Sequence, residues 1–134
     1  MVSEKTYMAV AHEFAKNSYC KRAQVGALIV KDGNVVSFGY NGTPKGWDNT
    51  CEDENNTTKP EVLHAESNAI AKCASSVNSS LGADIYCTHS PCIECAKLII
   101  QAGITTVYYD ILYRNEDGIK LLQNNNIIVK QVSL

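Results

Sequence analysis

The chain has 134 residues, 45% of them hydrophobic, which fits one core, so we expect a single domain spanning residues 1–134. No apolar run approaches the roughly 18 residues of a membrane span, and the N-terminus MVSEKTYMAV lacks the pattern of a signal peptide. The net charge is −2 and the basic residues are scattered, which argues against long nucleic acid as a partner and favours a small ligand.

These features predict a cytoplasmic protein with no membrane partner. Six cysteines are present, enough for three disulfides. Thiols stay reduced in the cytoplasm, and the chain has enough apolar residues for a core without covalent cross-links. We therefore expect no disulfide bonds, and we interpret Cys51 and His12 as structural residues.

The N-terminal third of the chain predicts a helix followed by a β-hairpin. Ser3 is placed to cap a helix over 4–17, in which apolar residues recur with helical spacing. The apolar run VGALIV over 25–30 is typical of a buried strand. The pair Asp32-Gly33 favours a tight turn that leads into a return strand over 34–39.

A long loop over 39–60 follows, rich in glycine, asparagine, threonine and proline, and a loop of this length is usually functional or disordered. Beyond it we expect helices over 62–74, 91–102 and 116–123, and strands over 84–87, 105–109 and 127–131. Because the last two strands are joined by a helix, we expect them to be parallel. The predicted fold class is α/β, a five-stranded mixed sheet with helices on both faces.

The stretch SPCIECAK places Cys92 and Cys95 in the first turn of an expected helix. The positive end of a helix dipole favours thiolates, so three interpretations compete: a redox pair, a structural metal site, or half of a catalytic metal site. Upstream, His64 and Glu66 open another expected helix. The combination of H-x-E with P-C-x-x-C is the signature of zinc-dependent deaminases.

In this interpretation His64, Cys92 and Cys95 bind one zinc ion, and water occupies the fourth position. Zinc lowers the pKa of such a water to about 7. Glu66 does not bind the metal and is free to transfer protons as a general acid and base. A structural site would need a fourth protein ligand and has no use for Glu66, and a redox pair would leave the H-x-E motif without a role.

With these motifs the chain resembles the dCMP deaminase branch of the cytidine-deaminase superfamily over nearly its whole length. The matching segments are CKRAQVGA (20–27), GYNGTP (39–44), HAESNAI (64–70), THSPCIECAK (88–97) and IIQAGI (99–104). The resemblance implies a three-layer fold with one zinc ion. It also implies hydrolytic deamination of dCMP to dUMP and ammonia, which supplies dUMP for thymidylate synthesis.

The resemblance implies substrate contacts at Asn41, for a sugar hydroxyl, and at the Ala65 N–H, for the base carbonyl. It implies further contacts at Tyr113 and Ser90. Arg22 is the candidate for the 5′-phosphate, because a guanidinium binds phosphate bidentately. Simpler interpretations remain open: Asn41 as a turn residue, Tyr113 as an exposed loop aromatic, and Arg22 as a solvated charge.

The resemblance further implies a homohexamer that dCTP activates together with Mg²⁺ and that dTTP inhibits, with Gly42 and Lys45 in the effector site. Some relatives carry an arginine where this chain has Ser75. Others bind a second zinc ion through a glutamate at the position of Val62, so we expect only one zinc ion here.

Three other functions compete with this one. A tRNA adenosine deaminase shares both motifs, but it needs a basic RNA surface and usually carries tryptophan and arginine where this chain has Tyr40 and Gly42. A free-nucleoside cytidine deaminase often uses cysteine in place of His64. A zinc-stabilised binding module without catalysis would not require Glu66.

Overall fold

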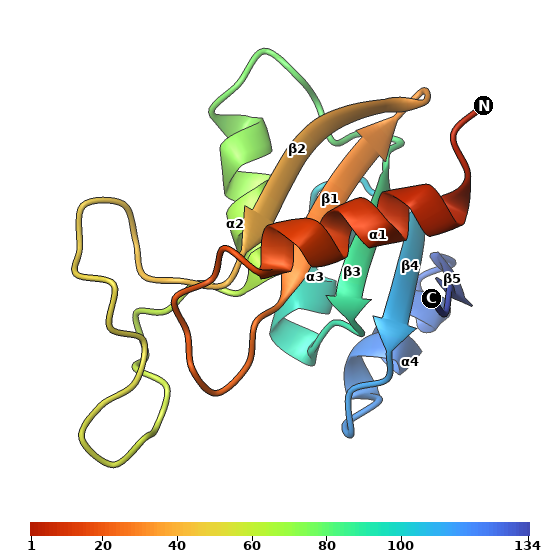
Figure 1. Ribbon diagram of the computed structural model, residues 1–134. Coiled ribbons are helices and arrows are strands. Elements are labelled where there is room, and N and C mark those ends of the chain that lie inside the picture. The colour runs from red at the N-terminus through yellow and green to blue at the C-terminus, as the bar shows by residue number, and fades with distance from the viewer.

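The computed structural model describes residues 1–134 as a five-stranded sheet with four helices (Figure 1). None of the helices has the length and apolar composition needed to cross a membrane. In chain order the elements are α1 (Glu4–Ala15), β1 (Gly26–Lys31), β2 (Asn34–Tyr40), α2 (Ala65–Ala74), β3 (Asp84–His89), α3 (Ile93–Gln101), β4 (Thr106–Ile111), α4 (Asp117–Asn124) and β5 (Ile128–Gln131).

The sheet is mixed, with the strand order β2-β1-β3-β4-β5. The strand β1 pairs antiparallel with both β2 and β3, whereas β3, β4 and β5 run parallel to one another. The expected α/β class and the parallel arrangement of the last two strands are therefore confirmed. The parallel pairing extends one strand further than expected, to β3, because α3 supplies a second crossover.

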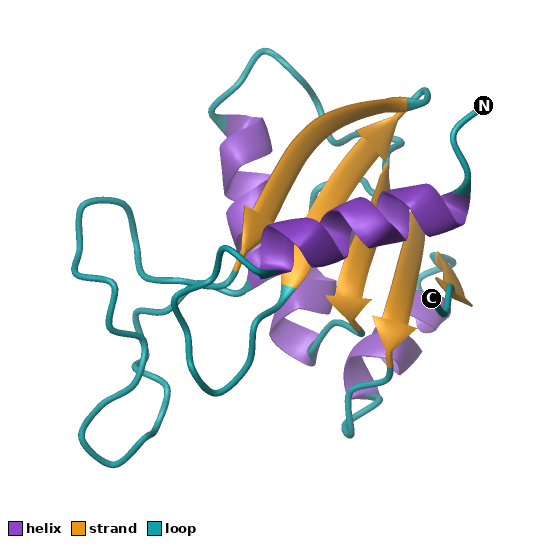
Figure 2. Ribbon diagram, in the orientation of Figure 1, coloured by secondary structure: helices purple, strands orange, loops and turns teal.

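Helices cover both faces of the sheet, as expected: α1 crosses one face, and α2, α3 and α4 lie behind the other (Figure 2). The alternation of side chains along β1 explains the two layers, since Leu28 and Val30 pack under α1 while Ala27 and Ile29 pack under α2. Ser3 caps α1 through a hydrogen bond from the Thr6 backbone N–H to its hydroxyl, 3.1 Å long.

Helix α2 begins at Ala65, three residues later than the expected start at 62. The preceding residue Leu63 is held in an extended conformation by two backbone hydrogen bonds with Gly42, of 2.8 and 3.1 Å. A residue paired in this way cannot adopt helical geometry, so the long loop sets the start of the helix. His64 consequently occupies the N-cap position, directly at the junction between the loop and the helix.

The expectation that all cysteines are reduced is wrong for one pair: Cys20 and Cys51 form a disulfide. Their Cα atoms are 5.2 Å apart, although 31 residues separate them in sequence. The bond joins the segment after α1 to the long loop after β2, and both sulfur-bearing residues are buried. The other four cysteines, Cys73, Cys87, Cys92 and Cys95, are free thiols.

Candidate metal and catalytic site

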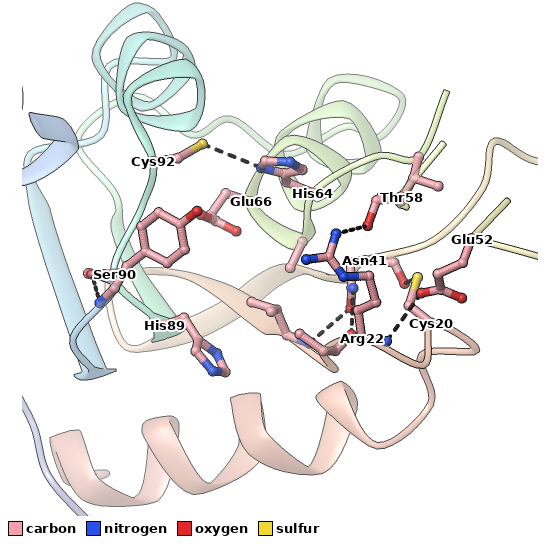
Figure 3. Close-up of a pocket in the computed structure, with 15 residues that line it drawn as sticks. Cys20, Arg22, Asn41, Glu52, Thr58, His64, Glu66, His89, Ser90 and Cys92 are labelled. Atoms are coloured by element: carbon pink, nitrogen blue, oxygen red, sulfur yellow. Dashed lines mark hydrogen bonds between the residues drawn. The ribbon is translucent and has the colours of Figure 1, made fainter. Parts of the chain in front are cut away.

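A cavity of about 290 Å³ lies between the N-terminal ends of α2 and α3 and the loops 18–25 and 41–63 (Figure 3). Nearly every residue singled out in the sequence borders it. These lining residues are Arg22, Asn41, His64, Ala65, Glu66, Ser90, Cys92 and Tyr113. Cys95 lies next to this lining, because its sulfur faces the imidazole of His64.

The metal-binding group consists of one imidazole nitrogen and two sulfurs. His64 Nδ1 is 3.4 Å from Cys92 Sγ and 3.3 Å from Cys95 Sγ. Zinc–sulfur bonds of about 2.3 Å and zinc–nitrogen bonds of about 2.0–2.1 Å in a tetrahedron separate such atoms by about 3.5 Å. The distances from the nitrogen to both sulfurs therefore fit a zinc ion, and all three ligand atoms lie within 4.8 Å of one another.

The positions of these ligands follow from the two helix starts. His64 is the N-cap residue of α2 and Cys92 that of α3, and both have extended backbone conformations. Residues at this position usually turn their side chain back to cap the helix. Neither His64 nor Cys92 makes such a bond. Their side chains are free for a metal ion, and the Ala65 N–H at the start of α2 makes no hydrogen bond within the protein and is free for a ligand.

The ionisation of the two thiols also fits a divalent cation. Hydrogen bonds from Cys95 and His64 lower the pKa of Cys92 to about 3. The hydrogen bond with Cys92, together with burial, raises the pKa of Cys95. Only one of the two thiols thus ionises readily by itself, and a bound dication is what stabilises both as thiolates.

Glu66 lies in the first turn of α2, almost fully buried, in the cavity beside His64 and Cys92 (Figure 3). Burial raises the pKa of this carboxyl group above its ordinary value. A carboxyl group with a raised pKa is protonated more easily than an ordinary one, and a general acid and base must both accept and return a proton.

Asn41 borders the cavity, and its side chain also holds the neighbouring loop in place. The Val25 N–H donates to Asn41 Oδ1, and Asn41 Nδ2 donates to the Ala23 carbonyl, each over 2.9 Å. An amide group offers two donors and two acceptor positions, so one of each remains for a ligand. Asn41 is therefore more than a turn residue, because it fixes the wall of the cavity.

Glu52 is a buried wall residue that the sequence did not indicate. Its Oε2 accepts hydrogen bonds from the Lys21 and Arg22 backbone N–H groups, at 3.0 and 3.2 Å. The exposed guanidinium of Arg22 reaches across to Thr58 Oγ1, at 3.4 Å. Glu52 stands in an acidic loop segment, Glu52-Asp53-Glu54, which has no spacing pattern, so only the folded contact reveals its role.

On the opposite side, Ser90 fixes the segment that carries Tyr113. The Ser90 hydroxyl accepts a 2.6 Å hydrogen bond from the Tyr113 N–H, and the Ser90 N–H donates to the Ile111 carbonyl over 2.9 Å. His89 also borders the cavity, and the sequence had assigned it no role, although it adjoins the motif SPCIEC.

A second cavity of about 250 Å³ lies on the other side of the long loop. Gly42 and Lys45 line it, as does Lys72 of α2, whose ammonium group lies 4.1 Å from the Phe38 ring centroid. Asn41 borders this cavity as well as the first one. Asn41 is the one residue that the two linings share.

Known proteins match most of the length of this chain. The model of the cytidine and deoxycytidylate deaminase zinc-binding region matches residues 1–111. ComE operon protein 2 of Bacillus subtilis is 41% identical over 96% of this chain and 70% of the relative. Human deoxycytidylate deaminase is 44% identical over 77% of this chain, which spans only 61% of the human enzyme.

Among solved structures, the dCMP deaminase of the cyanophage S-TIM5, crystallised with dCMP and dUMP, superposes with a TM-score of 0.95. It is 47% identical, and the match covers 98% of this chain and 99% of the phage enzyme. The family match covers both motifs of the cavity and the helices that carry them. This chain therefore belongs to the zinc-binding cytidine and deoxycytidylate deaminase family.

Proposed function

We propose that the chain is a dCMP deaminase, a single domain that hydrolyses dCMP to dUMP and ammonia. The observation that carries the proposal is the group of His64, Cys92 and Cys95 beside the buried carboxyl of Glu66, in one cavity. The cyanophage enzyme supports the choice of substrate, because it was crystallised with dCMP and dUMP and matches nearly the whole chain.

The proposed mechanism uses Glu66 for each proton transfer. Zinc, when bound by the three ligands, lowers the pKa of a water molecule and so provides a nucleophile at neutral pH. Glu66 accepts one proton from the attacking water and passes it to ring nitrogen N3, while the water oxygen bonds to C4. Glu66 then transfers the second proton of the water to the amino group, the C4–N bond breaks, and ammonia leaves.

The cavity walls would orient the nucleotide for this reaction. The Ala65 N–H, at the first position of α2, would donate to the base carbonyl. Asn41 has one donor and one acceptor left for a sugar hydroxyl, and Arg22 supplies a guanidinium for the phosphate. Tyr113 would contact the nucleotide directly, and Ser90 would act by holding Tyr113 in place.

An ultraviolet assay of deamination on dCMP, CMP, deoxycytidine and dCTP tests the proposal, with a tRNA anticodon stem-loop as a further substrate. We expect dCMP to have the highest kcat/KM, and Glu66→Gln to bind zinc but lose most of its turnover. A zinc-loaded wild-type protein that deaminates the stem-loop adenosine and none of the cytosine compounds would refute the proposed substrate.

We also propose that dCTP with Mg²⁺ activates the enzyme and dTTP inhibits it, within a cytoplasmic homohexamer that supplies dUMP for thymidylate synthesis. The second cavity supports the effector site: Lys45 and Lys72 provide positive charge, and Gly42 leaves its surroundings open to a ligand. Because Asn41 borders both cavities, an effector that moves it would change substrate affinity. Such couplings are typically about 1–3 kcal/mol and are reciprocal for binding.

Calorimetry and steady-state kinetics test the effector proposal. We expect sigmoidal dCMP kinetics that dCTP makes hyperbolic, and we expect Lys45→Ala to weaken the effects of both triphosphates. Sedimentation measures the assembly. Hyperbolic kinetics throughout, with no triphosphate bound outside the active site, would contradict the proposal.

A further inference from the structure

Few side chains of the catalytic cavity can carry a positive charge. Among the residues that line it, these are Arg22, His64 and His89. His64 belongs to the metal-binding group, so two cationic side chains remain. Arg22 is exposed and reaches toward Thr58, whereas His89 is half-buried at the C-terminal end of β3. A phosphomonoester is a dianion near neutral pH, so both residues are candidates to bind it.

The contacts of Thr88 define the tautomer of His89. Thr88 is fully buried, and its Oγ1 accepts a hydrogen bond from the Gly26 N–H at 3.0 Å. Its only other partner is His89 Nδ1, at 3.1 Å. A buried hydroxyl proton needs an acceptor, so we assign Nδ1 as the acceptor and place the ring proton on Nε2. Nε2 makes no hydrogen bond within the protein, so this N–H is an unused donor.

The charged groups behind His89 do not occupy this donor. His12 of α1 and Asp110 of β4 are hydrogen-bonded to each other, His12 Nε2 to Asp110 Oδ2, at 2.7 Å. Burial lowers the pKa of His89, and nearby His12 lowers it further, while Asp110 raises it. The ring is thus mainly neutral in the free protein, and a bound dianion would favour its protonated form.

The position of His89 matches the phosphate end of a nucleotide. Figure 3 shows His89 and His64 on opposite sides of the cavity, with Glu66 between them. The cytosine ring must lie at Glu66 and the metal-binding group, and the sugar separates the ring from the phosphate. The phosphate would then lie away from the metal-binding group, where Arg22 and His89 are the cationic side chains of the lining.

We propose that His89 binds the 5′-phosphate and, with Arg22, makes the enzyme select a nucleoside monophosphate over the nucleoside. This inference rests on the proposed function and adds a residue that determines substrate choice. The imidazole donates its Nε2–H to a phosphate oxygen, and Thr88 orients the ring from behind. No bond is made or broken at His89.

The test compares kcat/KM for dCMP and deoxycytidine in wild type, His89→Ala and His89→Gln, all loaded with zinc. Loss of a hydrogen bond to a charged group should lower the ratio of dCMP to deoxycytidine activity by about tenfold or more in His89→Ala. His89→Gln keeps a donor and should lose less. The matched control is Lys97→Ala, which removes an exposed cation of α3 that does not line the cavity and should leave the ratio unchanged.

Calorimetry with dUMP and deoxyuridine provides a readout that does not depend on turnover. We expect His89→Ala to weaken dUMP binding by about tenfold, with a smaller effect on deoxyuridine. Equal losses for nucleotide and nucleoside, in either assay, would show a structural role and overturn the inference. If the wild type binds deoxyuridine as tightly as dUMP, the inference fails while deamination stands. If the wild type deaminates nothing, the proposed function fails, and the binding comparison still decides the role of His89.

Discussion

Gly39 in β2 offers a sharp test of how the sheet positions the catalytic helix. A Cβ atom added at Gly39 would lie 2.4 Å from the Ala65 carbonyl oxygen and 2.5 Å from the Ala69 backbone nitrogen. Both are backbone atoms of α2, so no side-chain rotation relieves the clash. Ordinary contact begins near 3.4 Å, so β2 and α2 must separate by about 1 Å in Gly39→Ala.

This displacement should affect stability and catalysis together. Overpacking of this kind costs about 1–3 kcal/mol, which corresponds to a fall in Tm of about 4–10 °C for a chain of this size. The same first turn of α2 carries Ala65 and Glu66. Because a misplacement of about 1 Å can cost roughly 100-fold in rate, kcat should fall by one to two orders of magnitude.

Thermal unfolding by circular dichroism and the dCMP assay measure the two effects. Gly42→Ala is the matched control, since nothing lies within 4 Å of the added Cβ atom. We expect this control to keep its Tm and its activity without effectors. A Gly39→Ala protein with the Tm and kcat of the wild type would show that β2 does not set the position of α2.

The remaining predictions concern the chemistry of the site and the disulfide. Glu66→Gln should keep its zinc and lose about 10²–10⁴-fold or more in kcat, and turnover within a few-fold of wild type would remove Glu66 from the mechanism. Elemental analysis should find one zinc ion per chain, lost in Cys92→Ser, and two ions would contradict the single site. Reduction of the Cys20–Cys51 bond with a phosphine should lower the free energy of unfolding by about 3–4 kcal/mol, because the bond closes a loop between cysteines 31 residues apart. Urea unfolding measures this change, and an unchanged midpoint would contradict a closed disulfide.

Local patterns were sufficient to predict the elements of the fold. The capping position of Ser3, the apolar run of β1 and the Asp32-Gly33 turn each act within a few residues, and all three recur in the structure. The start of α2 could not be predicted in the same way. It depends on the backbone pairing of Leu63 with Gly42, which joins positions at opposite ends of the long loop.

The disulfide was missed because the prediction rested on a rule about compartments rather than on geometry. Cys20 and Cys51 lie in segments without regular structure, so no periodicity indicates that they meet. Only the fold of the long loop against 18–25 brings them together. Hydrogen bonds from the same segment to Glu52 and Asn41 also hold it against the long loop.

The two halves of the site therefore differ in how the sequence encodes them. The groups expected to bind zinc and transfer protons come from two short motifs, because a helix start fixes the spacing of His64 to Glu66 and of Cys92 to Cys95. The wall opposite them combines loops with the end of β3, and no sequence pattern indicates that Glu52 and His89 line it. In the proposed function, reaction type depends on the first group and substrate choice on the second. The assays that separate dCMP from deoxycytidine therefore test the second group directly.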